Sequence, residues 1–135
     1  MIDFHSHIIP AIDDGARELK EALEMLEEAS SAGFDGVIST SHYMENYYEV
    51  SQADRKAWLN GLQYGLEEKK IGLSLYLGSE IYFTDKIISL IKEAKASTIN
   101  GSRYVLFEFP MNAKPINIED FVYSILSANY VPVLA

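Results

Sequence analysis

The feature that most constrains the fold is a strict alternation of short apolar runs with longer amphipathic segments. Five runs have the length of buried strands: 1–4, 36–40, 73–77, 104–109 and 131–134. Segments with apolar residues at helical spacing separate them: 15–32, 51–70, 85–94 and the stretch after 117. This order predicts an α/β fold with parallel strands joined by crossover helices. An open doubly wound sheet and part of a βα barrel both satisfy it.

Polar residues and one glycine mark the ends of the predicted helices. Ser51, Thr84 and Asn117 stand where N-caps belong, and Gly33 stands where a C-cap glycine belongs. The helix over 51–70 contains two glycines, each of which costs about 1 kcal/mol relative to alanine. The helix is nevertheless predicted, because its apolar residues keep the helical spacing.

The length sets how much of such a fold the chain contains. We expect the 135 residues to form a single domain, 1–135. A closed βα barrel takes about 250 residues, so this chain would supply roughly half of one. The sequence ends directly after the fifth predicted strand. The barrel interpretation therefore implies a domain truncated after that strand.

Charge and composition exclude several classes of protein. The formal net charge of −9 disfavours binding to nucleic acid or to anionic lipid. No apolar run approaches the roughly 20 residues that span a membrane, and the N-terminus lacks the features of a signal peptide. The absence of cysteine excludes disulfides, thiolate metal sites and cysteine nucleophiles. A cytoplasmic protein without membrane insertion is expected.

Residues suited to metal binding follow the predicted strands one after another. They are His5 and His7 with the first run, Asp13 and Asp14 soon after, His42 after the second, Glu80 after the third and Glu108 near the end of the fourth. Parallel strands end on one face of the fold, where ligands bind. Imidazole and carboxylate together suit Zn, Mn or Fe better than Ca or Mg. The pattern predicts a metal site on that face.

Each residue alone also has an ordinary structural interpretation. A single His-x-His, or His42 by itself, is more often a hydrogen-bonded loop feature than a ligand. Glu108 interrupts an apolar run, and a buried glutamate needs a partner. Asp13 or Asp14 would also serve as a helix cap, and their spacing does not separate them. The combination after every strand is what favours the metal site.

The loop after His42 is rich in aromatic residues. Tyr43, Met44, Tyr47 and Tyr48 are too apolar for an idle loop. They would either line a pocket for an aromatic group or pack against the next helix or a second subunit. Tyr82 and Phe83, after Glu80, leave the same two alternatives.

The motifs DFHSHIIP…DDG, STSH, GSEIY and SRYVLFEF, in this order, resemble those of the PHP (polymerase and histidinol phosphatase) superfamily. Within it they are similar to the manganese-dependent protein-tyrosine phosphatases of bacterial capsule and exopolysaccharide loci. The resemblance covers the whole chain. It implies the N-terminal portion of a distorted (β/α)7 TIM-like barrel, with up to three Mn ions, or Fe or Zn, at the carboxyl-terminal rim.

The resemblance also implies a role for each matching residue. His5 and His7 would hold a first metal, and Glu80 would bridge it to a second, which Glu108 binds. Asp14 and His42 would hold a third, since the family pattern favours Asp14 over Asp13. Tyr43, Tyr47 and Tyr48 would contact the substrate. Members of the family continue with a further His, an Arg that holds the substrate phosphate, and an Asp-x-His, for which this sequence has no counterpart.

The implied function is hydrolysis of phosphotyrosine on the tail of a bacterial tyrosine autokinase, by a metal-bound hydroxide. This activity would regulate capsule or exopolysaccharide synthesis. One alternative is a catalytically incomplete fragment that self-associates, because an unfinished barrel exposes strand edges and apolar surface. A homo-oligomer is expected on that ground. Another alternative is a different PHP phosphoesterase, such as a histidinol-phosphate phosphatase.

Overall fold

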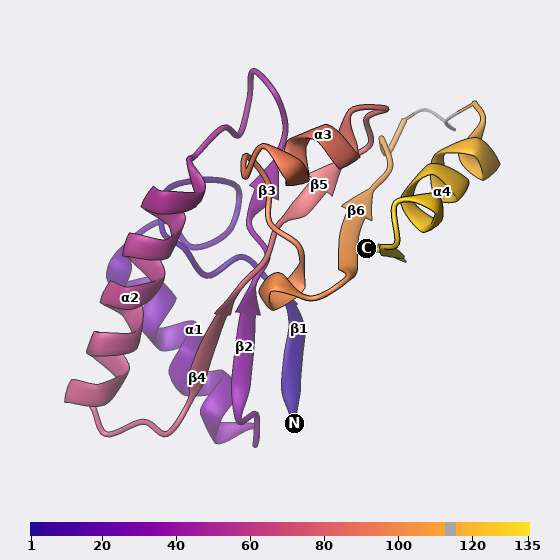
Figure 1. Ribbon diagram of the computed structural model, residues 1–135. Coiled ribbons are helices and arrows are strands. Elements are labelled where there is room, and N and C mark those ends of the chain that lie inside the picture. The colour runs from indigo at the N-terminus through magenta and orange to yellow at the C-terminus, as the bar shows by residue number, and fades with distance from the viewer. Residues whose placement is uncertain (113–115) are drawn as a thin grey trace.

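The computed structural model describes residues 1–112 and 116–135, and Figure 1 shows the order of its elements. Strands and helices alternate along the chain, as predicted. The strands are β1 (Ile2–Ser6), β2 (Gly36–Ser39), β3 (His42–Tyr43), β4 (Ser74–Leu77), β5 (Glu80–Tyr82), β6 (Tyr104–Glu108) and β7 (Val131–Leu134). The helices are α1 (Leu19–Ser31), α2 (Gln52–Glu68), α3 (Ile87–Lys92), the 3-10 turn η1 (Ile99–Gly101) and α4 (Ile118–Ser127).

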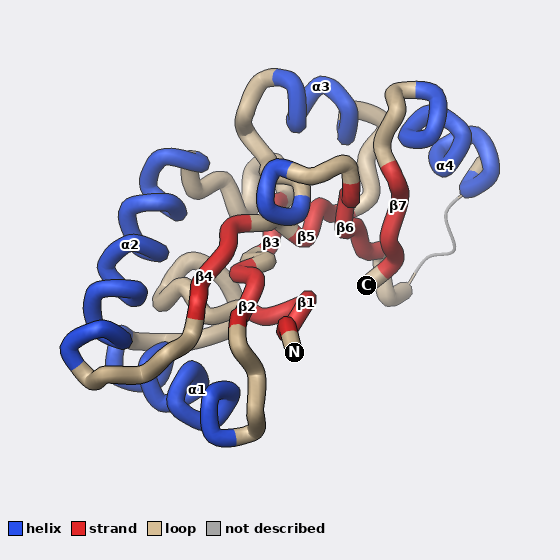
Figure 2. The backbone as a smooth tube through the Cα atoms, turned by 60° about the horizontal axis from the view of Figure 1, so that its bottom comes forward, coloured by secondary structure: helices blue, strands red, loops and turns tan. Residues whose placement is uncertain are grey.

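The strands form two parallel sheets whose order follows the chain. One sheet has the order β1-β2-β4 and the other β3-β5-β6-β7. Every ladder is parallel, as predicted. A doubly wound sheet reverses its strand order at a switch point, and none of the described strands does so. The strands instead follow an arc with the helices along its outer side (Figure 2), which is the arrangement of a βα barrel segment.

Five strands were predicted, and seven are present, because β3 and β5 lie beyond the predicted runs 36–40 and 73–77. β3 follows β2 after a bend at Thr40 and Ser41, and β5 follows β4 after a bend at Gly78 and Ser79. Pairing continues through the bend, since the Gly78 amide donates to the Ser39 carbonyl at 2.8 Å. A Cβ on Gly78 would lie 3.0 Å from Ile99, so the bend is tightly packed. Both bends aim the residues that follow them at the same rim.

The first strand is longer than predicted and contains a bulge. It runs through His5 to Ser6, so His5 lies within the strand rather than after it. Asp3 pairs with Val37 and Ser6 with Ser39, which leaves one extra residue on β1 between the two pairs. Bulges of this kind redirect side chains next to functional sites.

The first helix is shorter than the predicted 15–32. It begins at Leu19, because residues 11–16 form a loop held against the end of β1. The Ala16 amide donates to the His7 carbonyl at 3.0 Å, and the Ala11 amide donates to the Ala16 carbonyl at 2.8 Å. A Cβ on Gly15 would lie 2.2 Å from the His7 carbonyl oxygen, so only glycine fits there. Tertiary contact with His7 therefore overrides the helical pattern of the sequence.

Two of the predicted helix caps are confirmed, one is wrong, and one is correct in position only. The Ser51 hydroxyl accepts the Asp54 amide at the start of α2, and Gly33 has a φ of 91° just beyond α1. Thr84 was expected to cap a helix over 85–94, but α3 is shorter and Lys86 precedes it. Asn117 does occupy the N-cap of α4, but its side chain makes no capping bond there.

Two apolar clusters support the two sheets. The first joins α1 and α2 to β2 and is centred on Leu26, Val37, Leu62 and Leu66. The second joins α3 and α4 to β5 and β6 and includes Ile81, Phe107 and Ile125. Among the described residues, no helix combines the length and apolar character needed to cross a membrane.

Candidate metal centre

The three histidines of the chain gather with acidic residues at the carboxyl-terminal rim of the strands. His5 comes from β1, and His7 lies just beyond it. His42 opens β3 and is paired in register with Glu80, which opens β5. Glu108 ends β6 and pairs with Tyr82. Residues far apart in the sequence therefore meet because the parallel strands place them at one level.

One group of donors is formed by His5, His7 and Glu80. The Nε2 atoms of both histidines lie 2.9 Å from Glu80 Oε2, and 3.3 Å from each other. The two rings reach the same oxygen because they stand two residues apart along an extended chain. This trio faces a single point, as ligands of one ion do.

Two further groups share residues with the first. His42 Nδ1 lies 3.4 Å from Glu80 Oε2 and 3.0 Å from Glu108 Oε1. His42 Nε2 lies 3.4 Å from Asp14 Oδ1, which is also 3.4 Å from His7 Nδ1. Glu80 therefore joins the first group to the second, and His42 joins the second to the third.

These residues fit a set of divalent transition-metal ions. Nitrogen and carboxylate oxygen donors are the set that Mn, Fe and Zn accept. The Nδ1 atom of His42 is buried and has no hydrogen-bond partner among the described residues, although two carboxylates lie close to it. A buried polar atom without a partner is costly, and a bound cation would satisfy it.

The pKa values show how strongly the groups of the cluster interact. Burial lowers the pKa of His7, but its hydrogen bonds to Asp13 and Glu80 outweigh burial and raise that pKa to about 10. Burial raises the pKa of Glu80, but hydrogen bonds from His7 and His5 bring it below its usual value. The pKa of Glu108 is raised, first by burial and further by the negative charges of Glu80 and Asp14, against the opposing effect of His42. Crowded carboxylates of this kind are stabilised by cations.

The structure separates two aspartates that the sequence could not. Asp14 is 68% exposed and contributes to a donor group, as the family pattern implies. Asp13 is fully buried, belongs to none of the donor groups and lies behind His7, with Oδ2 at 3.1 Å from Nδ1. Sequence reasoning did not assign it this place, because only the folded loop brings it to His7.

The three tyrosines predicted to contact substrate occupy different environments. The Tyr48 ring stacks on His42 with centroids 5.5 Å apart, so it lies beside the cluster. Tyr47 is 75% exposed. Tyr43 is buried in the apolar cluster with Ile81, so the alternative of packing describes it better than a substrate contact.

A buried arginine was also missed at the sequence level. Arg55 on α2 is almost fully buried and donates to the Gly78 carbonyl, the Ser79 hydroxyl and the Lys95 carbonyl. Burial lowers the pKa of Arg55 to about 10, which leaves it charged at neutral pH. Its partners flank the bend immediately before Glu80, and its position on the inner side of α2 becomes visible only in the fold.

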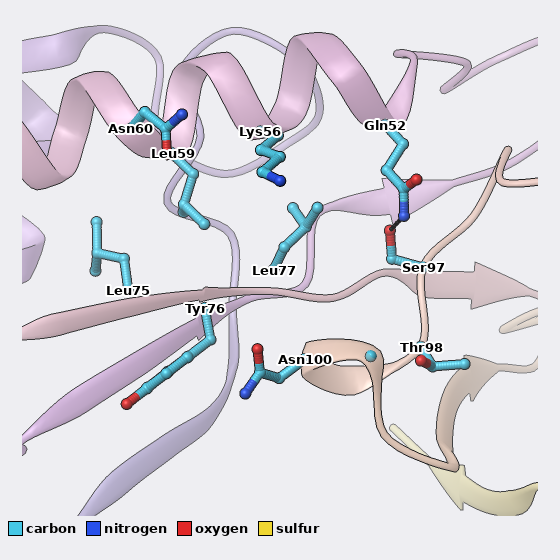
Figure 3. Close-up of a pocket in the computed structure, with 11 residues that line it drawn as sticks. Gln52, Lys56, Leu59, Asn60, Leu75, Tyr76, Leu77, Ser97, Thr98 and Asn100 are labelled. Carbon is cyan, nitrogen blue, oxygen red and sulfur yellow. Dashed lines mark hydrogen bonds between the residues drawn. The ribbon is translucent and has the colours of Figure 1, made fainter.

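A separate cleft of about 470 Å³ lies between α2 and β4 (Figure 3). Leu59 of α2 and Leu77 of β4 line it from facing sides (Figure 3), and the Gln52 amide donates to the Ser97 hydroxyl at 2.8 Å. None of the metal-site residues lines this cleft. The chemistry is therefore concentrated at the rim.

The fold and the site together define a class: a parallel α/β barrel segment that carries three linked groups of histidine and carboxylate donors at the ends of its strands. The chain belongs to the CpsB/CapC family of capsular polysaccharide synthesis, whose profile it matches over residues 1–135.

Several relatives match this chain over its full length. CapC of Staphylococcus aureus is 38% identical over 135 residues, the tyrosine-protein phosphatase YwqE of Bacillus subtilis is 30% identical over 135, and the tyrosine-protein phosphatase CpsB of Streptococcus pneumoniae is 33% identical over 137. Each match covers 100% of this chain and 53–56% of the relative. The chain thus spans about half the length of the curated relatives it matches.

A solved structure agrees with the sequence relatives. It comes from crystal structures of YwqE and of S. pneumoniae CpsB, which are described as metal-dependent tyrosine phosphatases. It superposes with a TM-score of 0.93 at 30% identity, over 99% of this chain and 54% of the other. The predicted resemblance is confirmed, and so is the predicted fold class.

Proposed function

We propose that residues 1–135 form the N-terminal half of one catalytic domain, a manganese-dependent protein-tyrosine phosphatase that acts on the tail of a bacterial tyrosine autokinase in capsule or exopolysaccharide synthesis. The observation that carries the proposal is the convergence of three donor groups on the rim, joined through Glu80 and His42. The phosphatases YwqE and CpsB, which this chain resembles over half their length, support the reaction type.

The residues divide the work of holding the ions. His5, His7 and Glu80 would hold the first ion, Glu80 and Glu108 the second, and Asp14 and His42 the third. Bound manganese would supply Lewis acidity, which lowers the pKa of a water nucleophile and neutralises charge on the phosphoryl oxygens. The remaining ligands and the arginine for the substrate phosphate would come from outside these residues, as the family pattern implies.

The substrate class follows from the leaving group and from the neighbouring ring. A tyrosine phenolate, with a pKa of about 10, leaves more readily than an alkoxide and needs a weaker general acid. Tyr48, whose ring stacks on His42, would contact the phenyl ring of a phosphotyrosine bound at the cluster. An aromatic phosphate ester is therefore favoured over histidinol phosphate.

The test compares two proteins on a phosphotyrosine peptide with added Mn²⁺ and with chelator. One is the chain of 135 residues, and the other continues it with the remaining half of YwqE. We expect manganese-dependent turnover in the fusion, lost on His42→Ala and retained on Tyr64→Ala, an exposed residue of α2. A fusion that folds, binds manganese and still leaves phosphotyrosine intact would overturn the proposal. Faster turnover of histidinol phosphate would replace it with that activity.

A further inference from the structure

Asp13 lies directly behind His7, in a loop that wraps the end of β1. We propose that Asp13 is a positioning residue: it holds the His7 ring with Nδ1 protonated, so that Nε2 is the nitrogen presented to the metal. This inference rests on the proposed metal centre and names a residue that supports it without being a ligand.

Both carboxylate oxygens of Asp13 make specific contacts. Its side chain is fully buried. Oδ1 accepts the Gly15 amide at 3.0 Å, and Oδ2 accepts the His42 amide at 2.9 Å. Oδ2 also lies 3.1 Å from His7 Nδ1. The carboxylate therefore ties the loop to His7, just beyond β1, and to the backbone of His42 in β3.

The surroundings of His7 Nδ1 decide its protonation state in a neutral ring. This atom is buried, and the polar atoms nearest to it are carboxylate oxygens, Asp13 Oδ2 at 3.1 Å and Asp14 Oδ1 at 3.4 Å. Nε2 faces a carboxylate as well, Glu80 Oε2 at 2.9 Å, but Glu80 is a donor of the first group, so an ion bound there would engage the Nε2 lone pair. A neutral imidazole carries one N–H, which is then on Nδ1, where it meets the Asp13 carboxylate and gives this otherwise unpartnered atom a partner.

The other side of the ring agrees with this assignment. His7 Nε2 faces Glu80 Oε2 at 2.9 Å and His5 Nε2 at 3.3 Å, which are the donors of the first group. Metal-binding histidines commonly donate their second N–H to a carboxylate, which fixes the ring orientation. His7 therefore belongs to the first group, and the third group draws only Asp14 and His42 from this chain.

The shape of the loop supports the same role. Gly15 lies so close to His7 that any side chain there would collide with it, and the Ala16 amide donates to the His7 carbonyl. The loop thus holds the backbone of His7 while Asp13 holds its ring. The backbone and the ring of His7 are thus held by two separate contacts, whereas a solvent-exposed turn would need neither.

The test measures metal binding directly, so it does not depend on turnover. Asp13→Ala removes both oxygens, and Asp13→Asn keeps one acceptor but loses the charge. We expect Mn²⁺ affinity to fall about 10–100-fold in Asp13→Ala and by less in Asp13→Asn. The matched control is Asp85→Asn, an exposed aspartate outside the cluster, which should leave affinity unchanged.

A purely structural role would lower stability without changing the His7 ring, so a spectroscopic readout separates the two. In the zinc-loaded protein, ring ¹⁵N shifts should show His7 protonated at Nδ1 and bound through Nε2, and this signature should be lost in Asp13→Ala. Unchanged affinity or an unchanged ring spectrum in that variant would overturn the role of Asp13 alone. Failure of the unaltered protein to bind Mn²⁺ or Zn²⁺ would overturn the metal centre, and this role with it. Metal binding without phosphotyrosine turnover would contradict only the proposed function.

Discussion

Glu80 is the residue on which the proposed centre depends most. One of its oxygens lies within 3.4 Å of a nitrogen from each of the three histidines. Glu80→Gln replaces the negative charge with a neutral amide, so it should weaken Mn²⁺ binding at least 100-fold while keeping the shape of the side chain. Isothermal titration calorimetry checks this against Glu27→Gln, a partly exposed glutamate of α1. Equal affinity in both variants would exclude a bridging role for Glu80.

The raised pKa of His7 makes metal binding depend on pH. Burial lowers that pKa, but the hydrogen bonds to Asp13 and Glu80 raise it to about 10, so His7 holds a proton at neutral pH when no metal is bound. A metal must displace this proton, and affinity should rise up to about tenfold per pH unit between pH 7 and 9. In the presence of chelator the pH dependence is opposite. The free energy of unfolding that protonated His7 contributes is fully present below pH 6.5 and is lost as the pH rises through about 10. Thermal melts over this range, with and without Mn²⁺, should show opposite trends.

At the residue scale, the sequence predicted every side chain that the structure places in a donor group. Five of the six follow from the rule that the strand ends of a parallel sheet share one face, whereas Asp14 was separated from Asp13 only by the family resemblance. Asp13 and Arg55 were missed for the opposite reason. Their roles depend on a loop folding back on His7 and on which side of α2 faces the sheet, and neither follows from spacing.

At the scale of elements, the strongest prediction concerns α2, because its residue Arg55 holds the bend before Glu80. Arg55→Ala would leave the Gly78 and Lys95 carbonyls without the Arg55 donor, whereas the Ser79 hydroxyl would keep the Ser97 amide. Each buried group left unsatisfied costs about 1–3 kcal/mol, so we expect a loss of about 3 kcal/mol in the free energy of unfolding. Urea denaturation measures it, with Lys56→Ala on the next, exposed position as control. A loss below 0.5 kcal/mol, the size of an ordinary surface change, would show that Arg55 does not hold the bend.

The elements also show where sequence patterns stop being informative. The alternation predicted the order of strands and helices, and the strand over 131–134 was placed at its observed limits. It did not predict β3 and β5, because the apolar runs end before them, although the same two segments stay paired, β2 with β4 and β3 with β5. The early end predicted for β1 and the early start predicted for α1 share one cause, the loop held on His7.

At the scale of the whole molecule, the arc of strands ends in two parallel edges, β1 and β7. Apolar side chains are exposed on both: Ile2 is 53% and Leu134 57% accessible, and Phe4 of β1 is also exposed. Unpaired parallel edges next to apolar surface favour association with another chain. We therefore expect the chain of 135 residues to self-associate through these edges. Its fusion to the remaining half of YwqE should form smaller oligomers, because the added strands would cover the edges.

Sedimentation velocity across a concentration series tests this expectation. The double variant Phe4→Lys with Leu134→Lys puts a charge on each edge and should shift the chain toward monomer. The matched control is the double variant Trp58→Lys with Tyr64→Lys, which adds the same two charges at exposed aromatic residues of α2 and should leave the assembly unchanged. Because both double variants raise the net charge by two, a shift confined to the edge variant is attributable to the edges. A monomeric unaltered chain at high concentration, or an equal shift in the α2 variant, would contradict association through β1 and β7.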